Sequence, residues 1–161
     1  MAPSPRPVVI HYERDFPYPP EVAYAWLTDY QDHDHERAGA IVKKRIVVRR
    51  EHDKDGRVVE VEFDGELETF GQKTKGRGIV HLHPDERRWV ATLGDKARWV
   101  YEYRLVPTPG GSRILIDYRL GSRRLRRRVL LTIMKPFIRR ELDKMWDGFA
   151  AAMEKELAPE G

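Results

Sequence analysis

Histidine and carboxylate residues at close spacing are the first candidates for chemistry in this chain. His33-Asp34-His35-Glu36 places two imidazoles two residues apart among carboxylates, and His81-Leu82-His83 repeats the histidine spacing. Imidazole nitrogens and carboxylate oxygens bind zinc, and this spacing suits a metal site in a strand or loop. A polar loop and a solvated strand end explain the same residues, and nothing in the sequence places the two pairs together. We therefore expect no metal site and no cofactor.

Alternating carboxylates are the second candidate, because acidic side chains that share one face of a strand can act as general acid and base. They are Glu60 and Glu62, followed by Asp64, Glu66 and Glu68. Tyr101 or Tyr103 can orient a polyphenolic substrate beside such groups. Strand carboxylates at this spacing are also typical of a solvated face, so we assign no catalytic residue.

Nucleophilic catalysis and phosphate binding lack their sequence motifs. The chain has no cysteine, and none of its serines lies in a Gly-x-Ser-x-Gly motif. The glycine-rich stretch Gly71–Gly78 lacks the Gly-Lys-Ser/Thr ending of a phosphate loop. The absence of cysteine also excludes disulfides and thiolate ligands to a metal.

An arginine run is the most pronounced charge feature of the chain. It comprises Arg123, Arg124, Arg126, Arg127 and Arg128. From residue 118 to residue 140 there are nine basic side chains and no acidic one, although the net charge of the whole chain is only +4. The basicity is therefore local, which is typical of a binding patch.

Three interpretations of the arginine run remain open. It can be the solvated flank of a helix, although neighbouring like charges repel one another. It can bind anionic lipid headgroups, where each basic side chain contributes about 1 kcal/mol, while the adjacent segment Leu130–Met134 enters the membrane interface. It can also bind nucleic acid, but an RNA-recognition sheet exposes its aromatic residues instead of covering them with a helix. We expect contact with an anionic membrane before contact with nucleic acid.

Length and composition indicate one folded domain. Hydrophobic residues make up 40% and charged residues 35% of the 161 positions, which is typical of a globular protein. We expect a single domain over residues 1–161, with frayed tails at 1–7 and 158–161. The apolar segment at 129–134 is far shorter than the ~20 residues that span a bilayer, and the N-terminal tail lacks the apolar core of a signal peptide. A cytoplasmic location is the default expectation.

The first part of the chain reads as a strand followed by helix. A strand is expected at 8–14, and a helix begins near Tyr18-Pro19-Pro20-Glu21, since proline and an acidic residue suit a first turn. The apolar positions predicted to share one face of this helix are Val22, Ala25 and Trp26. A second short helix is expected at 32–38.

From residue 41 the hydrophobic period changes to two. Strands are expected at 41–52, 57–63, 67–83, 87–93, 97–106 and 113–120. Asp53-Lys54-Asp55-Gly56 and Asp64-Gly65 are predicted turns. Such short connections leave no room for crossover helices, so the sheet is expected to be antiparallel.

The last part of the chain returns to a helical period. We expect a segment at 123–135 that is joined, by a kink or break at Pro136, to a helix reaching Leu157. The apolar stripe of that helix is predicted to consist of Ile138, Leu142, Met145, Phe149 and Met153, with Trp146 beside it.

Two segments resemble the helix-grip superfamily, often called SRPBCC, which includes START-related, birch-pollen-allergen-like and polyketide-cyclase-like proteins. Segment Tyr12–Tyr30 resembles the family's first strand and its proline-x-Val-aromatic helix with a Leu-x-Asp ending, and Phe137–Leu157 is similar to its closing helix. The resemblance and the order of elements imply an α+β fold. A curved seven-stranded antiparallel sheet would wrap around a long C-terminal helix, with one or two short helices after the first strand.

The resemblance also implies a cavity between the concave sheet and the last helix, which the superfamily uses for hydrophobic ligands. The residues predicted to line it are Trp89, Trp99, Tyr101, Tyr103, Ile116, Tyr118, Leu142, Met145 and Phe149. Large aromatic side chains with polar tips suit an amphipathic ligand. The alternative is that these side chains only fill the core beneath the helix.

Three functions follow from these readings. We favour the binding of a small hydrophobic or amphipathic ligand such as a lipid, quinone or polyketide, with transfer of that ligand as an extension of binding. The alternatives are a polyketide cyclase- or dehydratase-like enzyme that uses the same cavity, and a basic nucleic-acid-binding or assembly module with a filled core.

Overall fold

The computed structural model describes residues 6–29, 42–69, 72–93, 99–121 and 124–157. Within these residues the chain forms a first strand and a helix, then six further strands, and finally two helices. In chain order the elements are β1 (Val8–Phe16), α1 (Pro20–Leu27), β2 (Val42–His52), β3 (Val58–Thr69), β4 (Gln72–His83), a 3₁₀ turn (Pro84–Glu86), β5 (Arg88–Leu93), β6 (Trp99–Thr108), β7 (Gly111–Leu120), α3 (Leu125–Ile133) and α4 (Lys135–Leu157).

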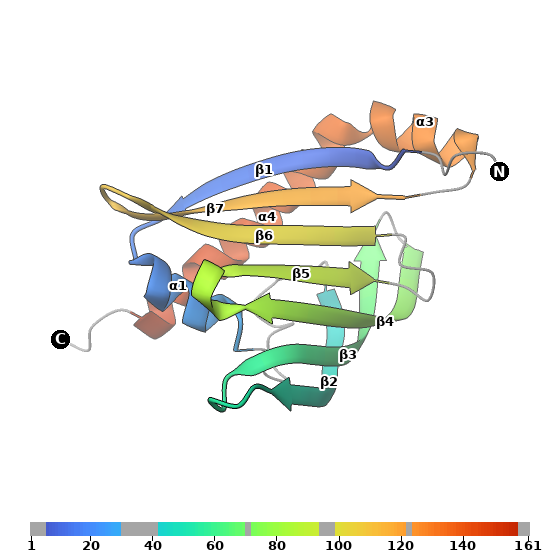
Figure 1. Ribbon diagram of the computed structural model, residues 1–161. Coiled ribbons are helices and arrows are strands. Elements are labelled where there is room, and N and C mark those ends of the chain that lie inside the picture. The colour runs from blue at the N-terminus through green and yellow to red at the C-terminus, as the bar shows by residue number, and fades with distance from the viewer. Residues whose placement is uncertain (1–5, 30–41, 70–71, 94–98, 122–123, 158–161) are drawn as a thin grey trace.

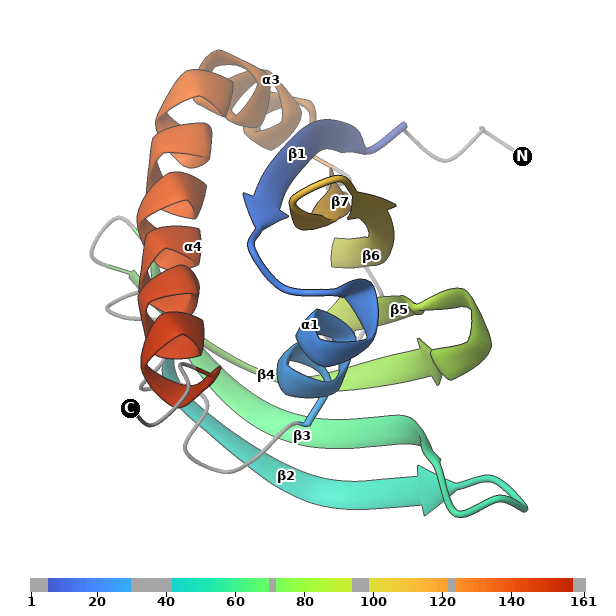
Figure 2. The same cartoon turned by 90° about the vertical axis from the view of Figure 1, so that its left-hand side faces the viewer.

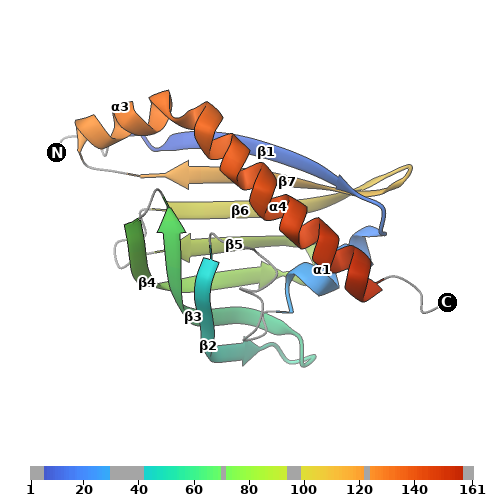
Figure 3. The same ribbon diagram turned by 180° about the vertical axis from the view of Figure 1, so that it is seen from behind.

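The strands form one seven-stranded antiparallel sheet in the order β1-β7-β6-β5-β4-β3-β2. The sheet is curved, and α4 crosses its concave face diagonally (Figure 1, Figure 3). α1 lies at the end of the sheet where α4 finishes, and α3 lies at the opposite end, against β1 (Figure 2). The predicted α+β helix-grip fold is confirmed. No helix in the described part of the chain is long and apolar enough to cross a membrane.

Alternation of side chains along β1 and β7 gives the sheet a buried apolar face and a solvent-exposed face. The ladder pairs Ile10 with Tyr118 and Tyr12 with Ile116, and all four side chains are buried on the concave side. His11, between them, is exposed on the convex side and lies beside Asp117. The apolar core therefore lies between the sheet and the helices that cover it.

The β2–β3 hairpin forms at the predicted turn. The Asp53 carboxylate accepts hydrogen bonds from the backbone N–H groups of Asp55 and Arg57, at 2.9 and 3.0 Å. Gly56 adopts a φ of 79°, a left-handed conformation that glycine adopts without steric cost. These contacts also lower the pKa of Asp53, with the backbone bond from Arg57 as the largest cause.

The predicted turn at Asp64-Gly65 is wrong, and so is the single strand predicted at 67–83. β3 continues through both residues, with Asp64 opposite Arg77 and Gly65 opposite Gly76 on β4. A two-residue hairpin turn needs a positive φ, and Gly65 does not have one. Asp64 and Arg77 instead form an ion pair at 3.1 Å across the two extended strands.

The predicted buried face of the first helix is also partly wrong. α1 buries Pro20, Ala23 and Trp26, whereas Val22 and Ala25 are exposed. The reason is that α1 contacts the end of the sheet and α4 only through side chains spaced three residues apart, so its buried face is narrow. The second short helix predicted at 32–38 lies outside the described residues.

The break predicted near Pro136 is confirmed. α3 ends at Ile133, and Pro136 lies in the first turn of α4, where its missing N–H removes no helical hydrogen bond. On α4 the fully buried side chains are Trp146 and Met153. Trp146, predicted beside the apolar stripe, therefore lies at its centre, while Ile138, Leu142, Met145 and Phe149 are partly buried against the core.

Candidate functional site

Three neighbouring strands present aromatic residues toward α4. The ladder places Trp89 of β5 opposite Tyr103 of β6, and Tyr103 opposite Ile116 of β7. The next row of the ladder consists of Ala91, Tyr101 and Tyr118. Since side chains two residues apart share a face, both rows lie on the concave side. We call Trp89, Trp99, Tyr101, Tyr103 and Tyr118 the aromatic face.

Ring contacts order the side chains of the aromatic face. Trp89 and Tyr103 stack with centroids 4.9 Å apart and planes 7° from parallel, while Tyr101 meets Tyr118 edge-on at 4.7 Å. Tyr24 of α1 approaches Trp89 edge-on at 5.6 Å, and burial raises the pKa of Tyr24 to about 12. These arrangements are the preferred geometries of aromatic pairs, each worth about 0.5–1.5 kcal/mol beyond area burial.

Polar contacts from α4 fix its position across the sheet. The Trp146 indole Nε1 donates a hydrogen bond to the Tyr118 hydroxyl at 3.0 Å, and the Tyr12 hydroxyl donates to Asp143 Oδ1 at 2.9 Å. Near the end of β1, Arg14 forms an ion pair with Asp147 at 2.6 Å. The helix is therefore held by specific side chains at successive turns as well as by its apolar stripe.

The space between α4 and the sheet is closed at the end near α1. Leu105 of β6 and Met153 of α4 are fully buried there. Trp26 of α1 meets Phe149 edge-on at 6.2 Å, and its indole N–H donates to Glu156 near the end of α4. This end of the molecule is a filled core.

Burial is less complete toward α3. Partly buried side chains lie on both sides of the core here. They are Trp99 and Tyr101 on β6, and Ile138 and Leu142 on α4. Trp99 pairs with Leu120, the last residue of β7 before the chain leaves for α3. The more accessible end of the aromatic face is therefore the end at which α3 lies.

The hydroxyls of Tyr101 and Tyr118 are the polar groups of the aromatic face whose pKa values are raised by burial. Burial raises the pKa of Tyr101 above its usual range, and desolvation is the sole cause. No hydrogen bond links its hydroxyl to another residue in the described part of the chain. Burial likewise raises the pKa of Tyr118, although the hydrogen bond from Trp146 opposes the shift. Both hydroxyls are therefore neutral near pH 7 and can donate a proton in a hydrogen bond.

The residues predicted to line a cavity all lie on β5, β6, β7 or α4. Trp89, Ile116 and Tyr118 are buried among their neighbours, and the six others keep some accessible surface. That they line a ligand cavity stays a prediction. Sequence reasoning placed Trp146 only beside the apolar stripe and did not predict that Tyr12 and Trp146 join α4 to the sheet. The alternation of Val8, Ile10 and Tyr12 carries a signal for Tyr12.

The sequence's other candidates for chemistry lie away from this face. Glu60 and Glu62 are on the convex side, where both contact Arg49, at 2.6 and 3.0 Å. His81 lies 3.3 Å from Glu60 on the same side, whereas His33 and its neighbours fall outside the described residues. The described residues contain no group of three potential metal ligands.

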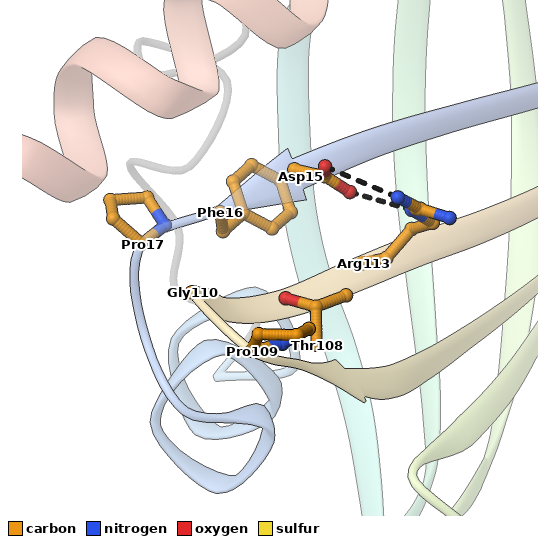
Figure 4. A pocket seen from close by; sticks show the side chains of 7 residues that line it. All are labelled: Asp15, Phe16, Pro17, Thr108, Pro109, Gly110 and Arg113. Atoms are coloured by element: carbon orange, nitrogen blue, oxygen red, sulfur yellow. Dashed lines mark hydrogen bonds and ion pairs between the residues drawn. The ribbon is translucent and has the colours of Figure 1, made fainter.

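Two surface grooves lie at the closed end of the molecule. The first, about 420 Å³ in volume, is lined by Asp15, Phe16, Pro17, Thr108, Pro109, Gly110 and Arg113 (Figure 4). Arg113 Nε donates to Asp15 Oδ1 at 2.7 Å, and this bond lowers the pKa of Asp15. The second groove, about 500 Å³, contains the pair of Arg14 and Asp147. Because each arginine is already paired with an aspartate, the aromatic face is the better candidate site.

The arginine run lies at the start of α3. Arg124 precedes the helix, and Arg126 and Arg127 are exposed on its first turn, while Arg128 is partly buried. Arg123 falls outside the described residues. The run and the aromatic face therefore belong to the same end of the molecule but not to the same surface.

A curved antiparallel sheet that grips a long helix, with an aromatic face beneath it, defines a helix-grip protein. Residues 7–154 match the family described as polyketide cyclase / dehydrase and lipid transport, and the chain belongs to this family. No curated protein matches the sequence.

Solved structures share the fold over nearly the whole chain. The Zhui aromatase/cyclase from Streptomyces sp. R1128 is 10% identical, with a TM-score of 0.73 over 96% of this chain and 98% of that one. A START superfamily protein from Mycobacterium smegmatis is 18% identical, with a TM-score of 0.63 over 94% and 99%. Ara h 8.0201 is 8% identical, with a TM-score of 0.64 over 92% and 98%. The predicted superfamily resemblance is confirmed, because the family match covers residues 7–154 and these structures share the fold.

Proposed function

We propose that the protein binds a small hydrophobic or amphipathic molecule, such as a lipid, quinone or polyketide, between the aromatic face and α4. The observation that carries this proposal is the state of Tyr101. Its side chain lies among apolar neighbours, keeps accessible surface and has no hydrogen-bond partner among the described residues. The Tyr118 hydroxyl, by contrast, accepts a hydrogen bond from Trp146 within the fold, so the Tyr101 hydroxyl is the one that keeps its hydrogen-bonding capacity for a ligand.

The chemistry of the aromatic face supports an amphipathic ligand. The stacked pair of Trp89 and Tyr103 supplies a broad apolar wall, and the Tyr101 hydroxyl supplies one hydrogen bond. Ligand sites typically combine such apolar walls with a few polar groups that fix orientation. Membership of a family whose description includes lipid transport supports the same class of ligand.

The composition of the concave side favours binding over acid–base catalysis. On β1, β5, β6 and β7, the described positions that face α4 carry no carboxylate or imidazole. Tyrosines whose pKa is raised by burial, as for Tyr101 and Tyr118, are poor general bases near pH 7. A cyclase-like activity, the alternative, would therefore have to use these hydroxyls as hydrogen-bond donors.

Native mass spectrometry tests the proposal. Protein purified without detergent should carry a noncovalent small molecule that organic solvent extracts, or should take up a fatty acid, a quinone or an aromatic polyketide from a defined panel. One ligand per chain is the expected stoichiometry. Purified protein that carries no small molecule and takes up no member of the panel would contradict the proposal.

A further inference from the structure

α3 carries its aliphatic side chains on the outside. Leu125 and Ile133 are 69% and 70% exposed, and Val129 and Leu130 are 50% and 53% exposed. Leu125, Val129 and Ile133 are spaced four residues apart, so they form one stripe along the helix. Only Leu131 of this helix is packed against the core as a partly buried apolar residue. A helix that merely connected β7 to α4 would turn this stripe inward.

The arginines of α3 are also unusual for this protein. Arg49 on β2 and Arg57 in the β2–β3 turn each contact three carboxylates. Arg126 and Arg127 are exposed, and within the described residues neither forms an ion pair. The helix therefore presents two exposed cationic groups, which have no ion-pair partner in the described part of the chain, beside an apolar stripe. We call Leu125, Arg126, Arg127, Val129, Leu130 and Ile133 the α3 patch.

We propose that the α3 patch docks the protein onto the surface of an anionic lipid bilayer. The aliphatic stripe enters the boundary between headgroups and acyl chains, and Arg126 and Arg127 bind lipid phosphates. Apolar burial and electrostatic attraction together are what hold interfacial helices at membranes. This proposal goes beyond the proposed function, because docking requires no ligand in the aromatic face.

The composition of the patch argues against other occupants. Nucleic acid would use the arginines but would leave the aliphatic stripe in water. A second copy bound through the same patch would bring the arginines of both copies together, since twofold contacts are self-complementary. A bilayer of anionic lipid satisfies both halves of the patch at once.

The position of α3 connects docking to the proposed ligand site. The helix follows β7 directly, at the end where Trp99 and Tyr101 keep accessible surface. Figure 3 shows α3 leading into α4, the helix that covers the concave face. Docking would hold the more accessible end of the aromatic face near the membrane, a consequence that rests on the proposed function.

Vesicle flotation tests docking directly. Vesicles of phosphatidylcholine with one-quarter phosphatidylglycerol should bind the full chain at least tenfold more tightly than vesicles of phosphatidylcholine alone. Binding should weaken steeply as salt shortens the Debye length from ~10 Å at 0.1 M to ~3 Å at 1 M. Ligand uptake is measured separately, in the absence of vesicles, so failure of docking and failure of ligand binding are separate results.

Paired variants identify the surface responsible. Leu125→Ser with Ile133→Ser, and separately Arg126→Gln with Arg127→Gln, should each lower vesicle affinity at least tenfold without lowering the melting temperature. Ile46→Ser with Val48→Ser, which are exposed apolar residues of β2, and Arg104→Gln on β6 serve as matched controls and should bind normally.

Two results would overturn the proposal. Absence of binding to anionic vesicles at 0.1 M salt would remove the membrane role. Loss of binding only in the arginine variant, with a short DNA duplex competing fully, would identify a polyanion surface instead of a lipid one.

Discussion

Two neighbouring tyrosines of the aromatic face, Tyr101 and Tyr118, differ in the hydrogen bonding of their hydroxyl groups. The Tyr118 hydroxyl accepts a hydrogen bond from Trp146, whereas the Tyr101 hydroxyl has no partner in the described part of the protein. Tyr118→Phe leaves the buried indole N–H of Trp146 unsatisfied, so we expect a loss of about 1–3 kcal/mol in the free energy of unfolding. Tyr101→Phe removes no intramolecular bond and should change stability by less than about 0.5 kcal/mol.

Urea unfolding of the two variants measures this difference. Equal losses would mean that the Tyr101 hydroxyl is already used within the fold, and would remove the main support for a ligand at that position. The pair is a matched comparison, because both substitutions delete one hydroxyl from adjacent rings in edge contact at 4.7 Å.

At the scale of the element, α4 is anchored by its later turns. Met153 is fully buried, whereas Leu142 is only partly buried nearer to α3. Met153→Ala should therefore cost about 2–5 kcal/mol, and Leu142→Ala clearly less, because its site already has accessible surface. Thermal or chemical unfolding gives the ranking. A larger loss for Leu142→Ala would show that the α3 end of the core is as tightly filled as the other end.

The elements themselves were largely predictable from sequence, because hydrophobic periodicity and turn-forming residues are local signals. The period-two pattern predicted the strands that became β5 to β7, and Asp53–Gly56 predicted a hairpin. The Asp64-Gly65 turn failed because cross-strand pairing with β4 keeps Gly65 extended. A turn dipeptide inside a long strand looks the same as one at its end, and only its partner strand decides between them.

The candidate site was predictable only in part, because its members come from different elements. Alternation along β5, β6 and β7 predicted which aromatic residues share a face. The path of α4 across that face depends on long-range contacts, such as those of Tyr12 with Asp143 and Arg14 with Asp147, which no local pattern encodes. For the same reason, the sequence located the arginines of α3 but not the exposure of Leu125 and Ile133 beside them.

At the scale of the whole molecule, the protein has a closed end and a more accessible end. Trp26, Phe149 and Met153 fill the closed end near α1. The accessible end combines the Tyr101 hydroxyl, which has no hydrogen-bond partner among the described residues, with α3 close by. A binding protein needs such a division, since the filled end stabilises the fold while the other end admits a ligand.

Uptake of the apolar fluorophore anilinonaphthalene sulfonate by two tryptophan variants of α4 tests the central claim most directly. Met145 is partly buried against the core, whereas Ala151 is exposed and lines the second surface groove. We predict that Met145→Trp fills the space above the aromatic face and abolishes the fluorescence increase, while Ala151→Trp binds the fluorophore like the unmodified protein. Both variants should unfold cooperatively. Normal uptake by Met145→Trp, together with its loss in Ala151→Trp, would place binding in the groove and contradict the account.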